Sequence, residues 1–146
     1  MAQKFETDKL IRIQHCDPGG VVFTPQYFNL YVEVVEDWFA TGLSFPFSRM
    51  VLDNRHGIPA MKIVAKFMKP SFMGDTLRYS LSVKRLRKTS VLINIKATCG
   101  AETRCAADFL FGFTALSQIG LTEWPPEMRK KMEDYQVRKS DESTGS

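Results

Sequence analysis

One segment of the chain is apolar on almost every side, and few folds can accommodate such a segment. Between Thr24 and Gly42 the polar side chains fall at helical spacing on one narrow stripe, formed by Asn29, Glu33, Glu36 and Asp37. The other positions are rich in Tyr, Phe, Leu, Val and Trp, so a helix here is too apolar to lie on a surface. We therefore predict a central helix wrapped by other elements, with Thr24 as its N-cap, Pro25 as its first residue and Gly42 at its end.

Most of the remaining chain alternates between apolar and polar residues with a period of two, as strands do. A first strand is predicted from Phe5 to Ile13, before the helix. Four more are expected after a loop around Pro46, at residues 61–67, 77–84, 91–98 and 105–113. The breaks between them are short enough for hairpins, at residues 70–75, 87–89 and 100–103, so we expect an antiparallel meander. A helix wrapped by such a sheet is an α+β arrangement.

The length of 146 residues favours one folded domain, which we place at residues 1–121. Residues 122–146 are expected to form a short helix, with Pro125 or Pro126 in its first turn, and then a disordered polar tail. A sheet wrapped around one helix leaves an edge strand and part of a face uncovered. We therefore expect a homodimer or homotetramer that covers both.

Composition narrows the class of protein further. No window approaches the ~20 apolar residues of a membrane span, and the charged N-terminal segment is unlike a signal peptide. The three cysteines, Cys16, Cys99 and Cys105, are odd in number and irregularly spaced, so they give no disulfide framework and suit a reducing compartment. Together with the lack of a membrane span and of a signal peptide, they predict a cytoplasmic protein with no membrane association. The two histidines, His15 and His56, lack ligand spacing, which argues against a metal. A net charge of +4 permits an anionic ligand without requiring nucleic acid.

The segment "HCDPGGVVFTPQYF", residues 15–28, places a carboxylate and a turn directly before the predicted helix. Asp-Pro-Gly-Gly is ordinary turn chemistry, and a plain surface turn would account for it. The alternative is an active site. The first N–H groups of a helix lack internal partners and carry the positive end of its dipole, so they can stabilise an oxyanion. Asp17 could then attack an acyl carbon, or activate a water that does so.

The residues "CDPGGVVFTPQYF" resemble the Asp-Pro-x-Gly-x-Val-x-x-x-x-Tyr segment of the 4-hydroxybenzoyl-CoA thioesterase family. The order of elements over residues 5 to 118 is similar to the hotdog fold of that family, in which a sheet wraps one long helix. The resemblance implies hydrolysis of acyl-CoA thioesters, with no cofactor beyond the coenzyme A of the substrate. It also implies that Asp17 is the nucleophile or general base, and that a backbone N–H at about Thr24 contacts the oxyanion.

Departures from the family pattern bear on the acyl group. The helix position that faces a ring hydroxyl in the hydroxybenzoyl enzyme falls near the apolar Val32, and the pocket position at residue 58 is Ile58. Because a buried phenol needs a hydrogen-bond partner, both changes favour an aromatic or other apolar acyl group without a ring hydroxyl. Phe47, Ile58 and Met61 would help to line its pocket, or would simply be core residues.

The segment "KRLRKTS", residues 84–90, places four basic side chains around a predicted hairpin. Such a run can be a solvated rim, or it can bind the phosphates of coenzyme A. The family resemblance assigns the second role to Arg87, Lys88 and Ser90. Nucleic-acid binding is not expected, because the outward face of the strand predicted at residues 77–84 carries no aromatic side chain on which a base could stack.

Two other functions remain open on the sequence alone. A non-catalytic acyl-CoA-binding protein of the same fold would keep the pocket without turnover. A hotdog hydratase would need a histidine beside its catalytic acid, and His15 lies two residues from Asp17. The helix-borne acids Glu33 and Glu36 could also act, although a solvated stripe accounts for them.

Overall fold

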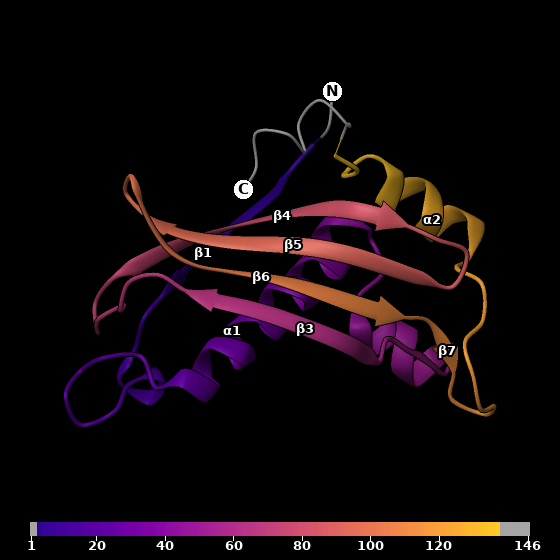
Figure 1. Ribbon diagram of the computed structural model, residues 1–146. Helices are drawn as coiled ribbons and strands as arrows, with labels where there is room; N and C mark the ends of the chain where they lie inside the picture. Colours follow the sequence, from indigo (N-terminus) through magenta and orange to yellow (C-terminus); the bar gives the residue numbers. More distant parts are fainter. Residues whose placement is uncertain (1–2, 138–146) are drawn as a thin grey trace.

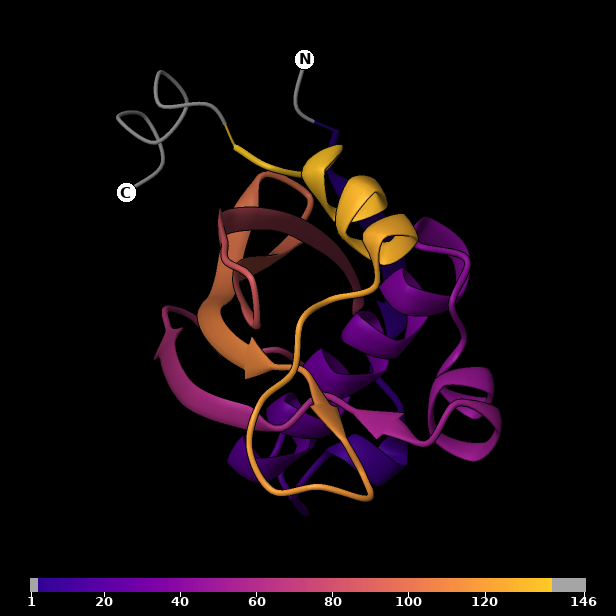
Figure 2. The same cartoon turned by 90° about the vertical axis from the view of Figure 1, so that its right-hand side faces the viewer.

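The helix predicted at the centre of the molecule lies there in the structure, a computed structural model that describes residues 3–137. Helix α1, Thr24–Asp37, continues directly into a π-helical turn, η2, at Trp38–Gly42. Its buried side is formed by Tyr27, Leu30, Tyr31, Val34 and Val35. Figures 1 and 2 show a curled sheet wrapped around this helix, which confirms the α+β prediction.

The two ends of the helical segment were not equally predictable. Phe23 rather than Thr24 is the N-cap, Thr24 is the first helical residue, and no side chain caps the helix. Pro25 suits either of the first two helical positions, since neither N–H has a partner within the helix, so Pro25 does not define the start. The helical path ends at Gly42 as predicted. A Cβ there would lie 2.6 Å from Trp38 Cδ1, so the close approach of that ring requires glycine.

Within the described residues, five strands form one antiparallel sheet in the order β1-β4-β5-β6-β3. Their bounds are Phe5–Leu10 for β1, Ala60–Phe67 for β3, Thr76–Leu86 for β4, Ser90–Cys99 for β5 and Glu102–Gly112 for β6. Two short strands, β2 (His56–Gly57) and β7 (Thr114–Ala115), pair with each other. A one-turn helix, η3, at Arg49–Asp53 precedes β2.

The hairpin prediction holds for β4–β5 and β5–β6 but is wrong for residues 70–75. β3 pairs with β6 at one edge of the sheet, whereas β4 lies between β1 and β5. A period of two identifies a strand but not its partner, so the pattern could not exclude this crossover. β1 is also shorter than predicted, because the chain forms a 3-10 turn, η1, at Ile13–His15 and leaves the Ile13 side chain exposed.

On β4, β5 and β6 the inner face carries the apolar residues that the alternation predicted, and they are buried against α1. Tyr31 packs edge-on against Tyr79 of β4 and Phe109 of β6, with ring centroids 5.7 and 5.5 Å apart. The hydroxyls of Tyr31 and Tyr79 lie in this apolar core, and burial raises the pKa of both phenols far above the usual range.

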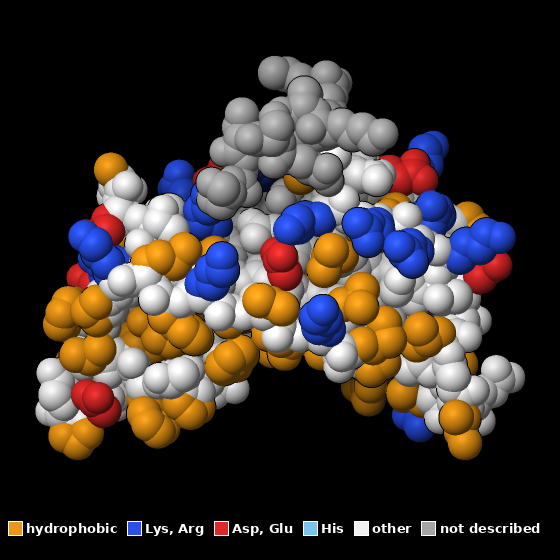
Figure 3. Space-filling model, in the orientation of Figure 1, with side chains coloured by type: hydrophobic (Ala, Val, Ile, Leu, Met, Phe, Trp, Pro, Cys, Tyr) orange, Lys and Arg blue, Asp and Glu red, His pale blue; other side chains and the backbone are white. Residues whose placement is uncertain are grey.

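The two edges of the sheet differ in character. On β1, Lys9 points inward to α1, and its Nζ lies 2.7 Å from Asp37 Oδ2. On β3, Met61, Ile63 and Phe67 are 45%, 43% and 45% exposed. Figure 3 shows apolar side chains gathered along the border that β3 forms, with Lys and Arg side chains above them over the rest of the sheet. Among residues 3–137 of one chain, the outer edge of β3 therefore has no strand partner, and its side chains are largely apolar.

The predicted C-terminal helix is α2, Pro126–Glu133, with Pro126 as its first residue. The segment around it buries four large side chains in the common core, namely Trp124, Met128, Met132 and Tyr135. The chain then runs beside β4, where Val83 N–H donates to Tyr135 O at 2.9 Å and Val137 N–H donates to Val83 O at 2.8 Å. The tail predicted to be disordered, residues 138–146, lies outside the described residues. No helix in residues 3–137 is long and apolar enough to cross a bilayer.

Candidate active site

Asp17 begins a tight turn that leads from η1 to α1. Its Oδ1 accepts hydrogen bonds from the N–H groups of Gly19 at 2.8 Å and Val21 at 3.4 Å. Gly20 N–H donates to the Asp17 carbonyl at 3.0 Å, and Gly20 has a φ of +80° that an L-residue rarely adopts. The Asp17 side chain is exposed, and no described residue donates to its Oδ2. The turn thus fixes the carboxylate and leaves one oxygen free.

The start of α1 offers a main-chain donor just beyond this turn. Among residues 3–137 nothing accepts a hydrogen bond from Thr24 N–H, and Pro25 has no N–H. Gln26 N–H is already engaged, since it donates to Phe23 O at 2.8 Å. An oxygen that acquires negative charge beside Thr24 would be stabilised by this amide and by the helix dipole.

His15 has a structural role in the same turn. Its ring is buried, and its Nδ1 accepts a hydrogen bond from Arg12 N–H at 2.9 Å, while its carbonyl accepts one from Phe23 N–H. The ring is therefore held by its own backbone neighbours, and the structure shows no hydrogen bond from it to Asp17. Glu33 and Glu36 are exposed on α1, and Glu33 Oε1 lies 3.6 Å from Lys9 Nζ, as expected for a solvated polar stripe.

Residues 70–75, which connect β3 to β4, pack against the Asp17 turn, and sequence reasoning missed this contact. Val22 N–H donates to Ser71 O and Met73 N–H donates to Gly20 O, both at 2.9 Å. Asp75 receives Phe72 N–H and the Arg104 guanidinium, and these two donors hold the pKa of its carboxyl below the usual range. The connection looked like an ordinary hairpin in the sequence, so it gave no sign of this role.

The residues predicted to line the acyl pocket lie at the other end of the molecule. Phe47 packs on Phe39 near the end of the helical segment, with ring centroids 5.3 Å apart, and Ile58 and Met61 lie at the start of β3. The other end of β3 lies beside the Asp17 turn, since Phe67 contacts Tyr27 in the first turns of α1. Figure 1 shows the loop before α1 and the start of β3 at opposite ends of the sheet. One chain therefore does not bring these residues to Asp17.

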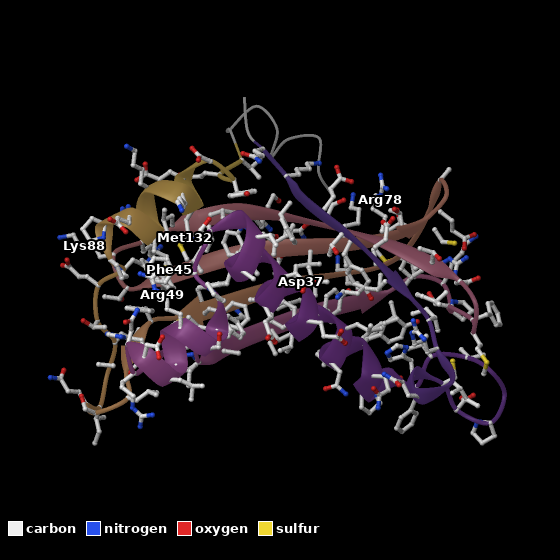
Figure 4. All side chains as sticks on the ribbon, turned by 180° about the vertical axis from the view of Figure 1, so that it is seen from behind. Asp37, Phe45, Arg49, Arg78, Lys88 and Met132 are labelled. Atoms are coloured by element: carbon white, nitrogen blue, oxygen red, sulfur yellow. The ribbon has the colours of Figure 1, made fainter. Side chains whose placement is uncertain are left out.

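The basic hairpin between β4 and β5 also lies at the far end, and α2 and the residue Trp124 before it support the hairpin. Trp124 Nε1 donates to Ser90 O at 3.2 Å, and Arg129 Nη1 donates to Arg87 O at 2.9 Å. The side chains of Arg87 and Lys88 remain exposed, and Figure 4 shows Lys88 at the end of the molecule away from Arg78. Arg87 and Lys88 are thus available to an anion, whereas Ser90 is half-buried.

A cavity of about 290 Å³ opens near this far end of the fold. Its lining is mainly apolar and consists of Phe45, Met50, Asn54, His56, Phe113, Pro125 and Met128. The His56 ring stacks on Phe113 with centroids 4.8 Å apart. None of the predicted site residues lines this cavity, and the Asp17 turn does not reach it.

Comparisons with known proteins agree with this architecture. The sequence profile of the thioesterase-like superfamily matches residues 11–132. A search of curated protein sequences found no match. A 1,4-dihydroxy-2-naphthoyl-CoA thioesterase from Synechocystis is similar in structure, with a TM-score of 0.82, 16% identity, and coverage of 90% of this chain and 97% of that one.

Two other solved structures have the same architecture. A thioesterase superfamily protein from Jannaschia sp. CCS1 gives a TM-score of 0.84 at 20% identity, over 92% of this chain and 94% of that one. A gentisyl-coenzyme A thioesterase gives a TM-score of 0.77 at 17% identity, over 88% of this chain and 99% of that one. The chain belongs to the thioesterase-like superfamily, and its sheet and central helix form a hotdog fold.

Proposed function

We propose that this protein is an acyl-CoA thioesterase of the 4-hydroxybenzoyl-CoA thioesterase type, which hydrolyses an aromatic or other apolar acyl-CoA to the free acid and coenzyme A. Water supplies the oxygen that bonds to the acyl carbon, the carbon–sulfur bond breaks, and coenzyme A leaves as the thiol. Asp17 acts as the nucleophile or as the general base for the water, and Thr24 N–H binds the developing oxyanion.

One observation carries this proposal. The exposed Asp17 carboxylate is anchored through Oδ1, keeps Oδ2 free, and precedes a helix whose first N–H has no acceptor in the described chain. An anchored base and an unpaired main-chain donor, joined by a short segment of chain, are the two groups that acyl transfer can use. The buried His15 ring, held by Arg12 N–H, gives no comparable support for a hydratase.

The working unit in this proposal is a homodimer, alone or within a tetramer, that pairs two β3 edges. A two-fold axis pairs these strands antiparallel, so the Ala60 end of one β3 meets the Phe67 end of the other. The Asp17 turn lies beside the Phe67 end, and Ile58 and Met61 lie at the Ala60 end. Each site would then combine Asp17 and Thr24 of one protomer with the acyl-lining residues of the other, Phe47, Ile58 and Met61.

Arg87 and Lys88 would bind the coenzyme A phosphates in the proposed complex, and Ser90 would assist. Their side chains project from a hairpin that α2 braces, so binding energy from the remote nucleotide can position the thioester. No cofactor is required beyond the coenzyme A of the substrate. The three free thiols fit a reducing compartment, and we place the enzyme in the cytoplasm.

The decisive experiment compares thiol release from acyl-CoA by the wild type, Asp17→Asn and Asp53→Asn. Asparagine keeps an oxygen that can accept the Gly19 N–H, so the turn should persist while the base is lost. We expect Asp17→Asn to lower kcat roughly 10²- to 10⁴-fold with coenzyme A affinity retained, and the exposed Asp53 control to behave as wild type. Undiminished turnover in Asp17→Asn would refute the mechanism. Coenzyme A binding without turnover in the wild type would indicate a binding protein instead.

A substrate panel tests the acyl preference. Benzoyl-CoA, phenylacetyl-CoA, 4-hydroxybenzoyl-CoA and short and long aliphatic acyl-CoA should be compared by kcat/KM. Two solved proteins of the same fold carry names with hydroxylated aromatic acyl groups, which supports an aromatic substrate. Val32 and Ile58 offer no partner for a ring hydroxyl, so the hydroxylated substrate should not be preferred. A preference of orders of magnitude for 4-hydroxybenzoyl-CoA would contradict this assignment.

A further inference from the structure

The guanidinium group of Arg104, on β6, contacts three residues of the segment that connects β3 to β4. Its Nη1 lies 2.8 Å from Asp75 Oδ2, 3.1 Å from the Pro70 carbonyl oxygen and 3.3 Å from Ser71 Oγ, and its Nε lies 2.6 Å from Glu102 Oε1. The Arg104 side chain is only 12% exposed, and Ser71 is fully buried. The ion pair with Asp75, whose side chain is 26% exposed, is better shielded than a solvated surface pair and holds its geometry more firmly.

The main chain of Arg104 holds the same connection. Its carbonyl accepts the N–H groups of Met68 at 2.9 Å and Lys69 at 3.1 Å, where β3 ends. Asp75 in turn accepts Phe72 N–H at 2.9 Å, which closes the connection on itself. Arg104 therefore fixes residues 68–75 to β6 through both its backbone and its side chain, and an ion pair between Lys69 and Glu102 adds a second, more exposed link.

The same connection is the surface on which the Asp17 turn rests. Ser71 O accepts Val22 N–H, and Gly20 O accepts Met73 N–H, on either side of the bridge between Val21 and Phe72. Val21 O in turn accepts Asp17 N–H at 2.9 Å. A continuous set of hydrogen bonds thus runs from the guanidinium, through residues 70–75, to the backbone that carries the carboxylate.

We propose that Arg104 is a positioning residue for Asp17, which it reaches through Ser71 and Asp75 without touching the substrate. The inference rests on the proposed function of Asp17 and adds a residue 87 positions away in the chain to the support of that site. Lysine cannot replace it fully, because Nη1 of Arg104 contacts Asp75, Pro70 and Ser71 while its Nε lies beside Glu102, and a single ammonium nitrogen cannot occupy both positions.

Kinetics should separate this role from a loss of general stability. Arg104→Met lets the Asp17 turn drift, and displacements of about 1 Å lower rates by up to roughly 100-fold. The basic hairpin lies at the other end of the sheet, so KM should change by less than about twofold while kcat falls roughly 10- to 100-fold. Arg104→Lys should recover part of the loss. If Arg104→Met does not fold, Asp75→Asn takes its place, and the same split between kcat and KM is expected.

Arg78→Met is the matched control. Arg78 also bridges two acids on the sheet, with Nε 3.0 Å from Asp8 Oδ1 and Nη1 3.8 Å from Glu6 Oε2, but it joins β4 to β1 and makes no contact with the turn. Its loss should leave kcat within about twofold of wild type. Equal kinetic effects of Arg104→Met and Arg78→Met would overturn the proposal.

Amide hydrogen exchange tests the relay independently of activity. Arg104→Met should raise the exchange rates of Val22 and Met73 at least tenfold over wild type, and Arg78→Met should not. Faster exchange together with an inactive wild type would reject the thioesterase function and keep the relay. Wild-type exchange rates in Arg104→Met would reject the relay, whatever the activity.

Discussion

Asp17 uses its two carboxylate oxygens differently, and glycines make this possible. Oδ1 is held by Gly19 N–H, and a Cβ at Gly19 would lie 3.3 Å from that oxygen. Gly20 then reverses the chain at a φ of +80°, and a Cβ on Gly20 would have no neighbour within 4 Å, so its constraint is conformational and not steric. The sequence identified this turn correctly, because the turn is encoded by local residues.

Gly20→Ala should therefore disturb catalysis through the backbone. An L-residue in this conformation costs about 1–2 kcal/mol, so the free energy of unfolding should fall by that amount and kcat should fall with it. Gly120→Ala provides the control, since Gly120 has a φ of +103° in a loop near β7. Thermal unfolding should show that the two variants are destabilised equally. Kinetic measurements should show a lower kcat for Gly20→Ala only. Full activity in Gly20→Ala would mean that the turn need not be held.

At the scale of elements, β3 has the most consequences for assembly. It is an edge strand of eight residues with apolar side chains exposed on its inner face. Ile63 lies near its midpoint, so in a two-fold pairing of β3 edges each Ile63 would lie close to its copy.

Ile63→Lys should consequently separate the proposed dimer. Two like charges near the axis, in an apolar interface, should weaken association more than about 100-fold, as measured by sedimentation equilibrium. Leu10→Lys makes the same change at an exposed position on the other edge strand, β1, and should leave the dimer intact. A monomeric wild type at micromolar concentration, or an Ile63→Lys variant that still dimerises, would contradict pairing through β3.

The elements themselves were largely predictable, whereas their partners were not. Alternation located β4, β5 and β6 because each buries every second residue against α1. It failed for the pairing of β3, since the partner of a strand depends on contacts distant in sequence. Arg104 was missed for the same reason: it occupies an outward position on β6, and only the folded chain brings Ser71 and Asp75 to it.

At the scale of the whole molecule, the candidate site is divided between two ends of one chain. Asp17 lies beside the Phe67 end of β3, and Arg87 and Lys88 extend from the β4–β5 hairpin at the other end. The sequence could indicate each group by its chemistry, but no pattern within one chain states which protomer completes which site.

Mixed dimers can reveal this division. Asp17→Asn alone and the double variant Arg87→Glu, Lys88→Glu alone should each be nearly inactive at low acyl-CoA concentration. If each site draws Asp17 and the basic hairpin from different protomers, random mixing should restore about one quarter of wild-type activity, because each heterodimer keeps one intact site. No recovery after subunit exchange, verified by mass spectrometry of the mixed species, would place both groups in the same protomer.

The inward-pointing Lys9 has a consequence for how many copies can associate. The β1 edge carries a charged side chain that points inward and forms a half-buried ion pair with Asp37, 2.7 Å away, so it is a poor template for another strand, whereas the β3 edge is a good one. A protomer with a single edge that can pair forms a dimer and then offers no second strand edge for further edge-to-edge growth. The fold therefore discourages filaments, and replacing Lys9 with an apolar residue would leave both edges open to polymerisation.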